Sequence, residues 1–341
     1  MIPKSRATLK DVAKLAQVSA KSVSRVINNE GGVSEETRQR ILAAVSELGY
    51  VANTTAKNLR GGAAGLGLIV SGFEDYAGQI IRGMSQAAQH LGYNLVLYVQ
   101  HGDDQPIESY RALLGSGLIG GLLMVVPYDY ERLTDLCGEY HLPYVLVDYE
   151  GRPPEPEVPT VSVTNRKGML EATRYLVALG HRRIGFITGL MSMASARERL
   201  QGYQEALAEI GLTFDPSLVA EGQWTRESGF AQTQILMHHH PDLSAIIASD
   251  DLMALGASDA VKESHLRVGE DISIIGFDDI PSAASAHPPL TTVRQPMPLM
   301  GQASVELLAA LLEGRPLISL RREFPTELII RQSTARYKDR A

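Results

Sequence analysis

The stretch TLKDVAKLAQVSAKSVSRVINNEGGVSEETRQRILAAVSELGYVAN, residues 8–53, indicates the fold of the N-terminal part of the chain. Apolar residues recur at helical spacing over residues 9–16, which predicts a first helix. A second helix is predicted after Ser19, whose hydroxyl suits an N-cap, and a third over residues 34–49. Two short helices joined by a tight turn, with a third that completes the core, are typical of a helix-turn-helix. A three-helix bundle with a solvated polar face is the alternative that the spacing leaves open.

The same spacing separates inward from outward side chains in these helices. The side chains that it turns inward in the second and third helices are Val23, Val26, Ile27, Ile41, Leu42, Val45 and Leu48. Those expected on the opposite face of the second helix are Ala20, Lys21, Ser24, Arg25 and Asn28. Lys21 and Arg25 can donate hydrogen bonds to guanine or to phosphate, so this outer face is suited to DNA.

The charge of the chain is distributed unevenly. Residues 1–60 hold ten Lys and Arg against five Asp and Glu, a net charge of +5. The remaining residues hold 22 basic and 34 acidic side chains, a net charge of −12. A basic head on an acidic body is what a DNA-binding protein needs, because phosphate then attracts the head alone.

The N-terminal stretch resembles the head of the LacI/GalR family of bacterial repressors almost position for position. One departure is Gln17, at a turn where the family usually has Gly. A non-Gly residue in a left-handed turn costs about 1 kcal/mol, which the helical core can absorb. The resemblance implies a recognition helix in the major groove that carries Ser19, Ala20, Lys21, Ser24 and Arg25. It also implies that Thr8 and Asn28 contact phosphates and set the register on DNA.

Residues 53–62, NTTAKNLRGG, form a short polar segment after the third helix. By itself the segment suggests a flexible linker. It also resembles the hinge of the LacI/GalR family, which becomes helical only on DNA. Two hinges of a dimer would then contact the minor groove from Asn53 onward, with Leu59 as an apolar wedge and Ala56 allowing close approach. Because so short a helix is unstable alone, we favour a switch over a linker.

The rest of the chain alternates short apolar runs with amphipathic helices. Strands are predicted at residues 67–70, 94–99, 121–126, 144–148, 183–188, 245–249 and 272–277. Several of the helices between them end at Leu-Gly or Ile-Gly, as at Gly92, Gly180 and Gly211. Apolar strands with helices between them predict parallel sheets covered on both faces. More than 200 residues of this pattern exceed one compact sheet, so we expect two doubly wound lobes.

This body also resembles the LacI/GalR family, whose body is related to periplasmic sugar-binding proteins. The matching segments are HRRIG (181–185), SARERLQGY (195–203), SDDLMALGA (249–257), DISIIGFDD (271–279) and PPLTTVRQP (288–296). The implied fold class is an all-α helix-turn-helix head plus an α/β body of two doubly wound parallel-sheet lobes of the periplasmic-binding-protein type. The expected domains are a head (1–52), a hinge (53–63) and a body (64–337). Its N-lobe would span 64–160 and 292–323 and its C-lobe 161–291 and 324–337, with crossings near 160, 291 and 323.

Ligand is expected in the cleft where strand ends of both lobes face each other. A sugar needs an apolar platform for its C–H face and polar groups for its hydroxyls. The resemblance assigns the platform to Trp224 and the hydroxyl contacts to Arg197 and Asp278. The structural alternatives are a core aromatic, a solvated helix cation and a strand-end cap, respectively.

Asp250 stands where members of the family often have Asn, and as a carboxylate it only accepts hydrogen bonds. It could instead be the N-cap of a helix over residues 252–262. The further residues that we expect at the cleft are Phe73, Asp75, Asp148 and Gln295.

Several classes of protein are disfavoured. We find no run of about 18 apolar residues and no secretory signal, so we expect a cytoplasmic protein that does not span a membrane. We also find none of the common nucleotide-binding, hydrolase or metalloprotease motifs, so we expect no enzyme. His238, His239 and His240 precede Pro241 and suggest a helix end rather than a metal site, and we expect no metal and no cofactor.

The expected partners are a palindromic operator in double-stranded DNA, a small effector and a second copy of the chain. The chain shows no leucine-heptad tail of the kind that makes tetramers, and two-fold sites demand at least a dimer, so we expect a homodimer. A repressor is expected, with a sugar as effector and a galactoside as the first candidate. The alternative is the same regulator with a purine, a sugar phosphate or a partner protein as effector.

Overall fold

The computed structural model describes residues 9–27, 31–48, 65–72, 75–100, 106–149, 155 and 157–338. The chain divides into two compact units, Met1–Ala63 and Ala64–Ala341, which we call the head and the body. Six of the predicted site residues lie outside the described part of the chain: Thr8, Asn28, Asn53, Ala56, Leu59 and Phe73.

The head contains the three predicted helices, α1 (Leu9–Leu15), α2 (Ala20–Ile27) and α3 (Glu35–Leu48). Gln17 has a φ of 54°, so the left-handed turn expected between the first two helices is present. The oxygen of the Ser19 side chain accepts a hydrogen bond from the backbone N–H of Ser22 at 3.0 Å, as an N-cap does. The fully or nearly fully buried core is Val12, Ala13, Ala16, Val23, Val26, Ile41 and Ala44.

Two side chains of α3 that were predicted to be buried are exposed. Leu42 is 42% exposed because it lies one residue beyond the buried Ile41, about 100° further around the helix. Leu48 is the last residue of α3 and is 36% exposed. Ala44 takes the inward position between them, where a small side chain lets the helices approach.

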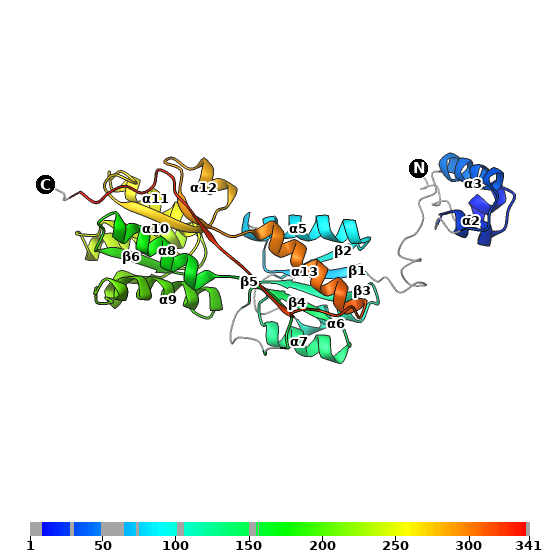
Figure 1. Cartoon of the computed structure of the whole chain (residues 1–341), viewed down its shortest axis with the longest axis horizontal. Coiled ribbons are helices and arrows are strands. Elements are labelled where there is room, and N and C mark those ends of the chain that lie inside the picture. Colours follow the sequence, from blue (N-terminus) through cyan, green and yellow to red (C-terminus); the bar gives the residue numbers. More distant parts are fainter. Residues whose placement is uncertain are drawn as a thin grey trace. The chain divides into compact units, whose positions relative to one another are not determined.

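The body begins with an N-lobe built on a six-stranded parallel sheet of order β11-β5-β4-β3-β1-β2. The strands are β1 (Gly65–Val70), β2 (Leu95–Val99), β3 (Ile119–Val125), β4 (Tyr144–Val147), β5 (Thr160–Val163) and β11 (Arg321–Phe324). Helices α5 (Asp75–Leu91) and α13 (Met297–Leu312) cover one face, and α6 (Ile107–Leu114) and α7 (Tyr130–Glu139) cover the other (Figure 1). Covered faces explain why every residue of β1 is buried.

The C-lobe repeats this plan with the order β12-β10-β9-β8-β6-β7. Its strands are β6 (Ile184–Thr188), β7 (Val219–Glu221), β8 (Ala245–Ala248), β9 (Ser273–Asp278), β10 (Thr291–Arg294) and β12 (Glu327–Ile329), the last antiparallel to β10. Helices α8 (Asn165–Ala178) and α9 (Ala194–Glu209) cover one face, and α10 (Arg226–His239) and α11 (Asp251–Glu263) cover the other. The short helices η1 (Pro216–Leu218) and α12 (Pro281–Ser285) complete this lobe.

All seven predicted strands are present, and the fold class is confirmed. The five strands that were not predicted, β5, β7, β10, β11 and β12, are each only three or four residues long. The chain passes between the sheets after β5, after β10 and after β11, a few residues later than the crossings expected near 160, 291 and 323. The expected crossings were early because β5, β10 and β11 are themselves strands of the lobe that the chain is leaving.

Hydrogen bonds tie the first and third crossing segments together. Thr164 follows β5, and its side-chain oxygen accepts a hydrogen bond from the backbone N–H of Thr326 at 3.1 Å. The two threonine hydroxyls also lie 3.1 Å apart. The first and third crossings therefore form one joint between the lobes.

Candidate functional site

A cavity of about 530 Å³ lies between the two lobes of the body. Residues at or just beyond the carboxyl ends of strands line it: Ser71 after β1, Val126 after β3, Asp148 after β4, Asp250 after β8 and Asp278 at the end of β9. Ligands of doubly wound proteins bind at this edge of the sheet, and here two such edges meet. The volume is within the range of small-molecule pockets.

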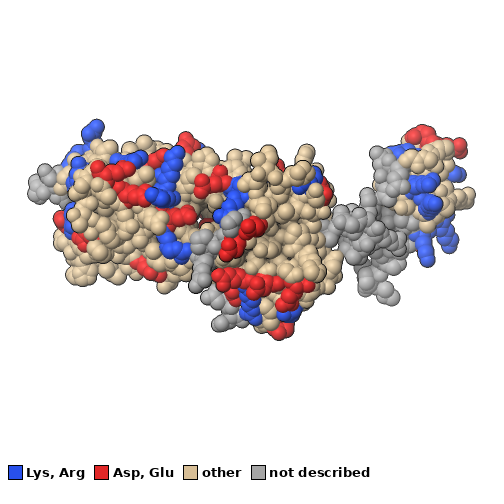
Figure 2. Space-filling model, turned by 60° about the horizontal axis from the view of Figure 1, so that its bottom comes forward, with Lys and Arg blue, Asp and Glu red and all other residues tan. Residues whose placement is uncertain are grey.

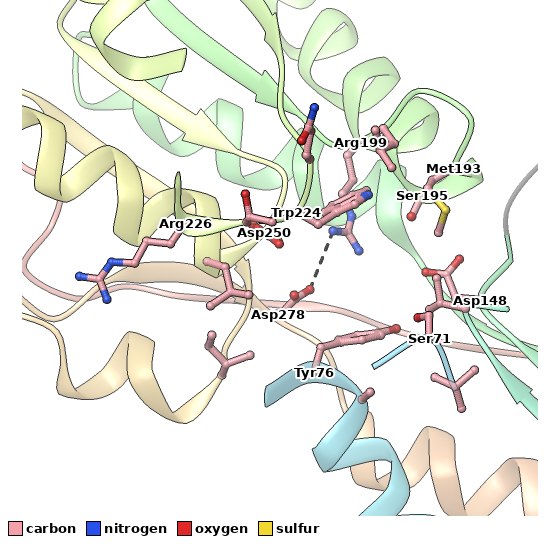
Figure 3. Close-up of a pocket in the computed structure, with 18 of the residues that line it drawn as sticks. Ser71, Tyr76, Asp148, Met193, Ser195, Arg199, Trp224, Arg226, Asp250 and Asp278 are labelled. Carbon is pink, nitrogen blue, oxygen red and sulfur yellow. Dashed lines mark ion pairs between the residues drawn. The ribbon is translucent and has the colours of Figure 1, made fainter. Parts of the chain in front are cut away.

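Four of the residues expected from the sequence meet in this cavity: Asp148, Trp224, Asp250 and Asp278 (Figure 3). The three carboxylates come from both lobes; Asp250 and Asp278 are buried from solvent, and Asp148 is half-buried. Burial raises the pKa of Asp278 to about 8 and that of Asp250 to about 6, although Arg199 opposes both shifts. Burial also raises the pKa of Asp148.

Arg199 is the buried cation of the cavity and lies on α9. A guanidinium nitrogen is 3.8 Å from Asp278 Oδ1, and the guanidinium carbon is 3.8 Å from the centre of the Phe277 ring. Its Nε donates to Asn165 Oδ1 at 2.9 Å, and its Nη1 donates to the carbonyl of Ser249. These contacts fix the guanidinium beside the space that a ligand would occupy.

The indole of Trp224 supplies an aromatic wall. It lies so close to Gly189 that a Cβ added there would be 1.9 Å from the ring, so only Gly fits beneath it. The Arg199 guanidinium lies 5.7 Å from the indole centroid. Trp224 Nε1 is buried and has no hydrogen-bond partner among the described residues, which leaves a donor for a bound molecule.

Backbone strain is concentrated around the cavity. The lining residues Val126, Asp148, Trp224 and Asp278 have φ values of 44°, 56°, 60° and 119°. Non-Gly residues seldom adopt positive φ, and a β-branched residue such as Val126 is a clear outlier. Such strain persists where the surrounding structure holds a functional geometry in place. The strand ends therefore hold these side chains in position before any ligand arrives.

Arg197, the arginine expected to bind effector, does not line the cavity. Its Nη1 donates to the carbonyl oxygens of Met191 and Ser192, which precede α9. Two residues along a helix turn the side chain by about 200°, so Arg197 and Arg199 cannot share a face. The buried Tyr203 marks the inward face, and Arg199 lies four residues before it. The spacing within SARERLQGY thus held the signal that identifies Arg199.

Two other expected residues lie beside the cavity rather than on its wall. Gln295 is buried, and its Nε2 donates to Asp278 Oδ1 at 2.6 Å. It therefore positions the Asp278 carboxylate without lining the cavity itself. Asp75 begins α5 and accepts a hydrogen bond at 3.0 Å from the hydroxyl of Ser282 on α12, which joins the two lobes directly. Asp250 caps α11, because its Oδ1 accepts from the backbone N–H of Met253 at 2.7 Å, and it lines the cavity as well.

No sequence pattern pointed to several lining residues of the N-lobe and of the start of α9. They are Ser71, Tyr76, Tyr128, Met193 and Ser195. Among these residues, Tyr76 lies close to carboxylates of both lobes: burial and the neighbouring Asp148 and Asp278 raise the pKa of its hydroxyl. It follows Asp75 at the start of α5, and only the approach of the two lobes brings it near carboxylates of both.

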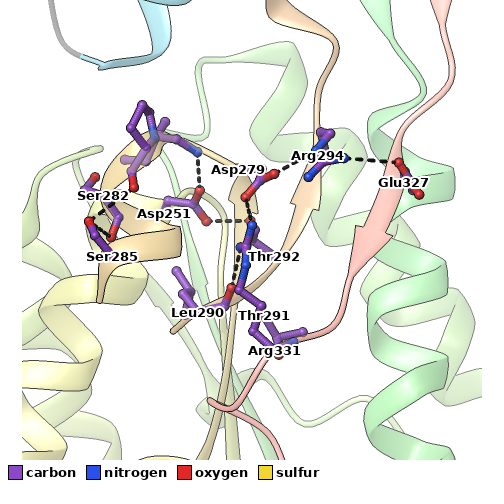
Figure 4. A network of polar contacts seen from close by, with 12 residues as sticks. Asp251, Asp279, Ser282, Ser285, Leu290, Thr291, Thr292, Arg294, Glu327 and Arg331 are labelled. Atoms are coloured by element: carbon purple, nitrogen blue, oxygen red, sulfur yellow. Dashed lines mark hydrogen bonds and ion pairs between the residues drawn. The ribbon is translucent and has the colours of Figure 1, made fainter. Parts of the chain in front are cut away.

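A polar network holds the strand ends from which Asp278 projects (Figure 4). Asp279 pairs with Arg294 at 2.7 Å and with Arg331 at 2.6 Å, which ties β9 to β10 and to the segment after β12. The buried Asp251 accepts hydrogen bonds from the Thr292 hydroxyl and, at 2.9 Å, from the backbone N–H of Ile280. This network fixes the C-lobe wall of the cavity.

The head has its own candidate surface. Ala20 and Lys21 on α2 are exposed, as is Ser19 before it, while Ser24 and Arg25 are half-buried. Figure 2 shows Lys and Arg side chains over much of the visible face of the head, with acidic side chains gathered at one end. The outward side of α2 therefore presents cations and small polar groups, as a surface for DNA requires.

Comparison with known proteins identifies the family of the chain. Residues 8–53 match the family described as "Bacterial regulatory proteins, lacI family", and residues 173–334 match the periplasmic binding protein-like domain. The HTH-type transcriptional regulator CelR of Thermobifida fusca is 37% identical over 339 residues, which cover 96% of this chain and 98% of CelR. The chain belongs to the lacI family. Like these relatives, this lacI-family member is a DNA-binding transcription regulator and not an enzyme.

Other relatives of this lacI-family chain agree with that assignment. The HTH-type transcriptional repressor CytR of Escherichia coli (strain K12) is 34% identical over 333 residues, covering 96% of each chain. A structure described as the transcriptional regulator CelR–cellobiose complex has a TM-score of 0.72 and 35% identity and covers 96% of this chain and all of that one. The lac repressor dimer bound to operator and the anti-inducer ONPF has a TM-score of 0.84 and 31% identity, covering 96% and 99% of the two chains.

Two further features of the described residues bear on function. None of their helices is long and apolar enough to cross a membrane. Nor do their His, Cys, Asp and Glu side chains form a group of three that could hold a metal ion. His239 ends α10, so the histidine run lies at a helix end, as predicted.

Proposed function

We propose that this lacI-family member represses transcription from a palindromic operator as a homodimer, and that a neutral sugar in the cavity controls its affinity for DNA. The observation that carries the proposal is the meeting of the Trp224 indole with the Arg199 guanidinium and the Asp278 carboxylate in one cavity. An indole face packs against the C–H face of a sugar, and the charged groups bind its hydroxyls. Since operator DNA lies in the bacterial cytoplasm, we place the protein there.

The carboxylates suit hydroxyl groups in particular. An ionised carboxylate is an acceptor only, and a hydroxyl can donate to it. Arg199 and the orphan Trp224 Nε1 supply the complementary donors for hydroxyl and ring oxygens. A purine ring nitrogen without a hydrogen is itself an acceptor, so it would gain no hydrogen bond from the carboxylates of Asp148, Asp250 and Asp278. The balance of groups therefore favours a sugar.

The relatives narrow the choice of sugar to be tested. CelR has been seen with cellobiose, and the lac repressor with ONPF and ONPG. The lac-like motifs make a galactoside the first candidate, and CelR adds cellobiose as a second. A cavity of about 530 Å³ is large enough for either a monosaccharide or a disaccharide.

Control of DNA binding would follow from the position of the cavity. Both lobes contribute to its lining, so a bound sugar favours one relative orientation of the lobes. Segment 53–63 would transmit this orientation to the head by folding as a pair of hinge helices on DNA. A coupling of about 1–3 kcal/mol is typical of such regulation. Induction and co-repression are the two signs that this coupling can take.

The test has two stages. A thermal-shift screen of the full chain against neutral mono- and disaccharides, nucleobases and sugar phosphates should give its largest rise in Tm with a neutral sugar. Trp224→Ala should abolish that rise, and Arg197→Ala, outside the cavity, should retain it. The sugar should then change operator affinity in a gel-shift assay by about 5- to 150-fold. A rise in Tm with only nucleobases or phosphates, or an unchanged operator affinity, would contradict the proposal.

A further inference from the structure

The cavity carries more negative than positive groups. Asp250 and Asp278 are buried within it, Asp148 is half-buried, and the exposed Glu227 lies on its rim. Its lining cations are Arg199 and Arg226. Among the described residues that line the cavity, two carboxyl groups and one guanidinium are thus buried, and a third carboxyl group is half-buried.

Each arginine already pairs with a carboxylate of the protein, so neither carries an unmatched positive charge for an anionic ligand. Arg199 already donates to Asn165 and to the Ser249 carbonyl and pairs with Asp278 at 3.8 Å. Arg226 lies toward the far end of the lining and points away from Asp148 (Figure 3). Its Nε pairs with Asp259 on α11 at 2.6 Å, outside the lining.

We propose that the cavity selects its sugar by charge: it rejects phosphorylated and acidic sugars, accepts neutral and amino sugars, and owes this selectivity chiefly to Asp250. The inference rests on the proposed function, because it assumes that a sugar occupies the cavity. It adds the chemical class of sugar and the residue that discriminates among such sugars.

Asp250 is the residue best placed to do so. One oxygen accepts the α11 cap hydrogen bond from Met253, and its other oxygen has no hydrogen bond to a described residue. Asp278, in contrast, is held by Gln295 and Arg199. An ammonium group on a ligand would pair with the free oxygen of Asp250, and a phosphate would be repelled by it.

The electrostatic surroundings agree with this assignment. The charged groups that interact with Asp250 are Asp251 on α11, Asp278 on β9 and Arg199 on α9. The other titratable and charged groups of the cavity lining are Asp148 after β4, Tyr76 on α5, and Arg226 and Glu227 on α10. Burial raises the pKa of Asp250 to about 6, and the pKa of Asp251 is raised by burial and by Asp278 and Asp250. Because burial disfavours the ionised form of each carboxyl, a cationic group on a ligand would stabilise these carboxylates and an anionic group would destabilise them further.

The first experiment compares matched ligands. The neutral sugar found in the screen is titrated calorimetrically beside its 2-amino-2-deoxy, 6-phosphate and 6-O-methyl forms, the last controlling for bulk. The amino sugar should bind as tightly as the neutral one or more tightly, and the phosphate at least tenfold more weakly than the 6-O-methyl form. Asp250→Asn, which keeps the helix cap, should reduce both preferences severalfold. A phosphate that binds as well as the methyl form, or preferences unchanged in Asp250→Asn, would overturn the inference.

The second experiment needs no ligand, so it separates this inference from the proposed function. A carboxyl whose pKa is raised by folding holds a proton that the unfolded chain releases, so stability falls as pH rises through that interval. The Tm should therefore fall between about pH 4 and pH 8, and the part of the fall below about pH 6, where Asp250 releases its proton, should be smaller in Asp250→Asn. Asp135→Asn, at an exposed position on α7, should leave the fall unchanged. If no sugar binds but this difference appears, the proposed function is wrong, whereas the inference that Asp250 is a buried acidic group of the cavity is supported. Equal slopes would overturn the inference whatever binds.

Discussion

The two lobes of the body share a sheet order but contribute differently to the cavity. The C-lobe provides Arg199, Trp224, Asp250 and Asp278, each at or near the carboxyl end of a strand or on α9. The N-lobe provides Asp148 and a wall of small, apolar and tyrosyl side chains: Ser71, Tyr76, Ala77, Val125, Val126 and Tyr128. Two lobes with the same sheet order thus differ in role: the C-lobe supplies most of the charged groups for a ligand, and the N-lobe supplies most of the uncharged wall. Chemistry is set by the residues at the strand ends, not by the sheets.

The largest expected effect on this difference between the lobes comes from removing the buried C-lobe cation, Arg199. Arg199→Met should lower the free energy of unfolding by about 3–5 kcal/mol, because it removes the buried partner of Asp278 and the donor to Asn165 and to the Ser249 carbonyl. It should also abolish sugar binding. Urea denaturation at pH 7.5 and the thermal-shift assay measure the two effects. Arg197→Met, two residues away and outside the cavity, should change stability by less than about 1 kcal/mol. Equal losses in the two variants would show that the cavity does not depend on Arg199.

A second prediction compares a buried ion-pair network in the C-lobe with an exposed ion pair in the N-lobe. Asp279→Asn in the C-lobe should cost about 2–3 kcal/mol of unfolding free energy, because the Asp279 side chain is 7% exposed and pairs with two arginines. Glu306→Gln in the N-lobe breaks the Arg322–Glu306 pair, whose side chains are 38% and 41% exposed. That change should cost less than about 1 kcal/mol. Denaturant midpoints test the difference, and a larger loss in Glu306→Gln would reverse the comparison.

The smallest expected effect concerns the direct contact between the lobes. Ser282→Ala removes the hydrogen bond to Asp75, which is exposed and 3.0 Å long, and should cost about 0.5–1 kcal/mol. Ser285→Ala on the same helix is the control, because its hydroxyl bonds only to backbone carbonyls of α12. A loss above about 2 kcal/mol in Ser282→Ala alone would mean that this contact, and not the cavity lining, holds the lobes together.

Much of the fold could be predicted because its signals are local. Long apolar strands such as β1 and β9, the capping Ser19 and the left-handed Gln17 follow from neighbouring residues alone. The short strands β7 and β12 could not be predicted, because three residues show no periodicity. Each exists because a longer strand beside it offers unpaired backbone groups.

The candidate site divides in the same way. Trp224, Asp250 and Asp278 stand in motifs whose residues are consecutive, so the sequence could place them at strand or helix ends. The arginine of the cavity was predicted two residues too early, at Arg197 instead of Arg199. The motif contains both arginines, and only the inward face of α9 distinguishes them. Tyr76 was missed because its neighbours Asp148 and Asp278 are far away in the sequence.

The sequence by itself determined the family, the helix-turn-helix head, the two-lobed α/β body and the strand ends that carry the acidic side chains. The tertiary structure decided which arginine enters the cavity, how strongly the carboxylates hold their protons, and which N-lobe side chains cover them. The physical reason is that helix and strand signals depend on residues a few positions apart. Burial, electrostatic coupling and the excess of carboxyl groups arise only when distant segments share one poorly solvated space.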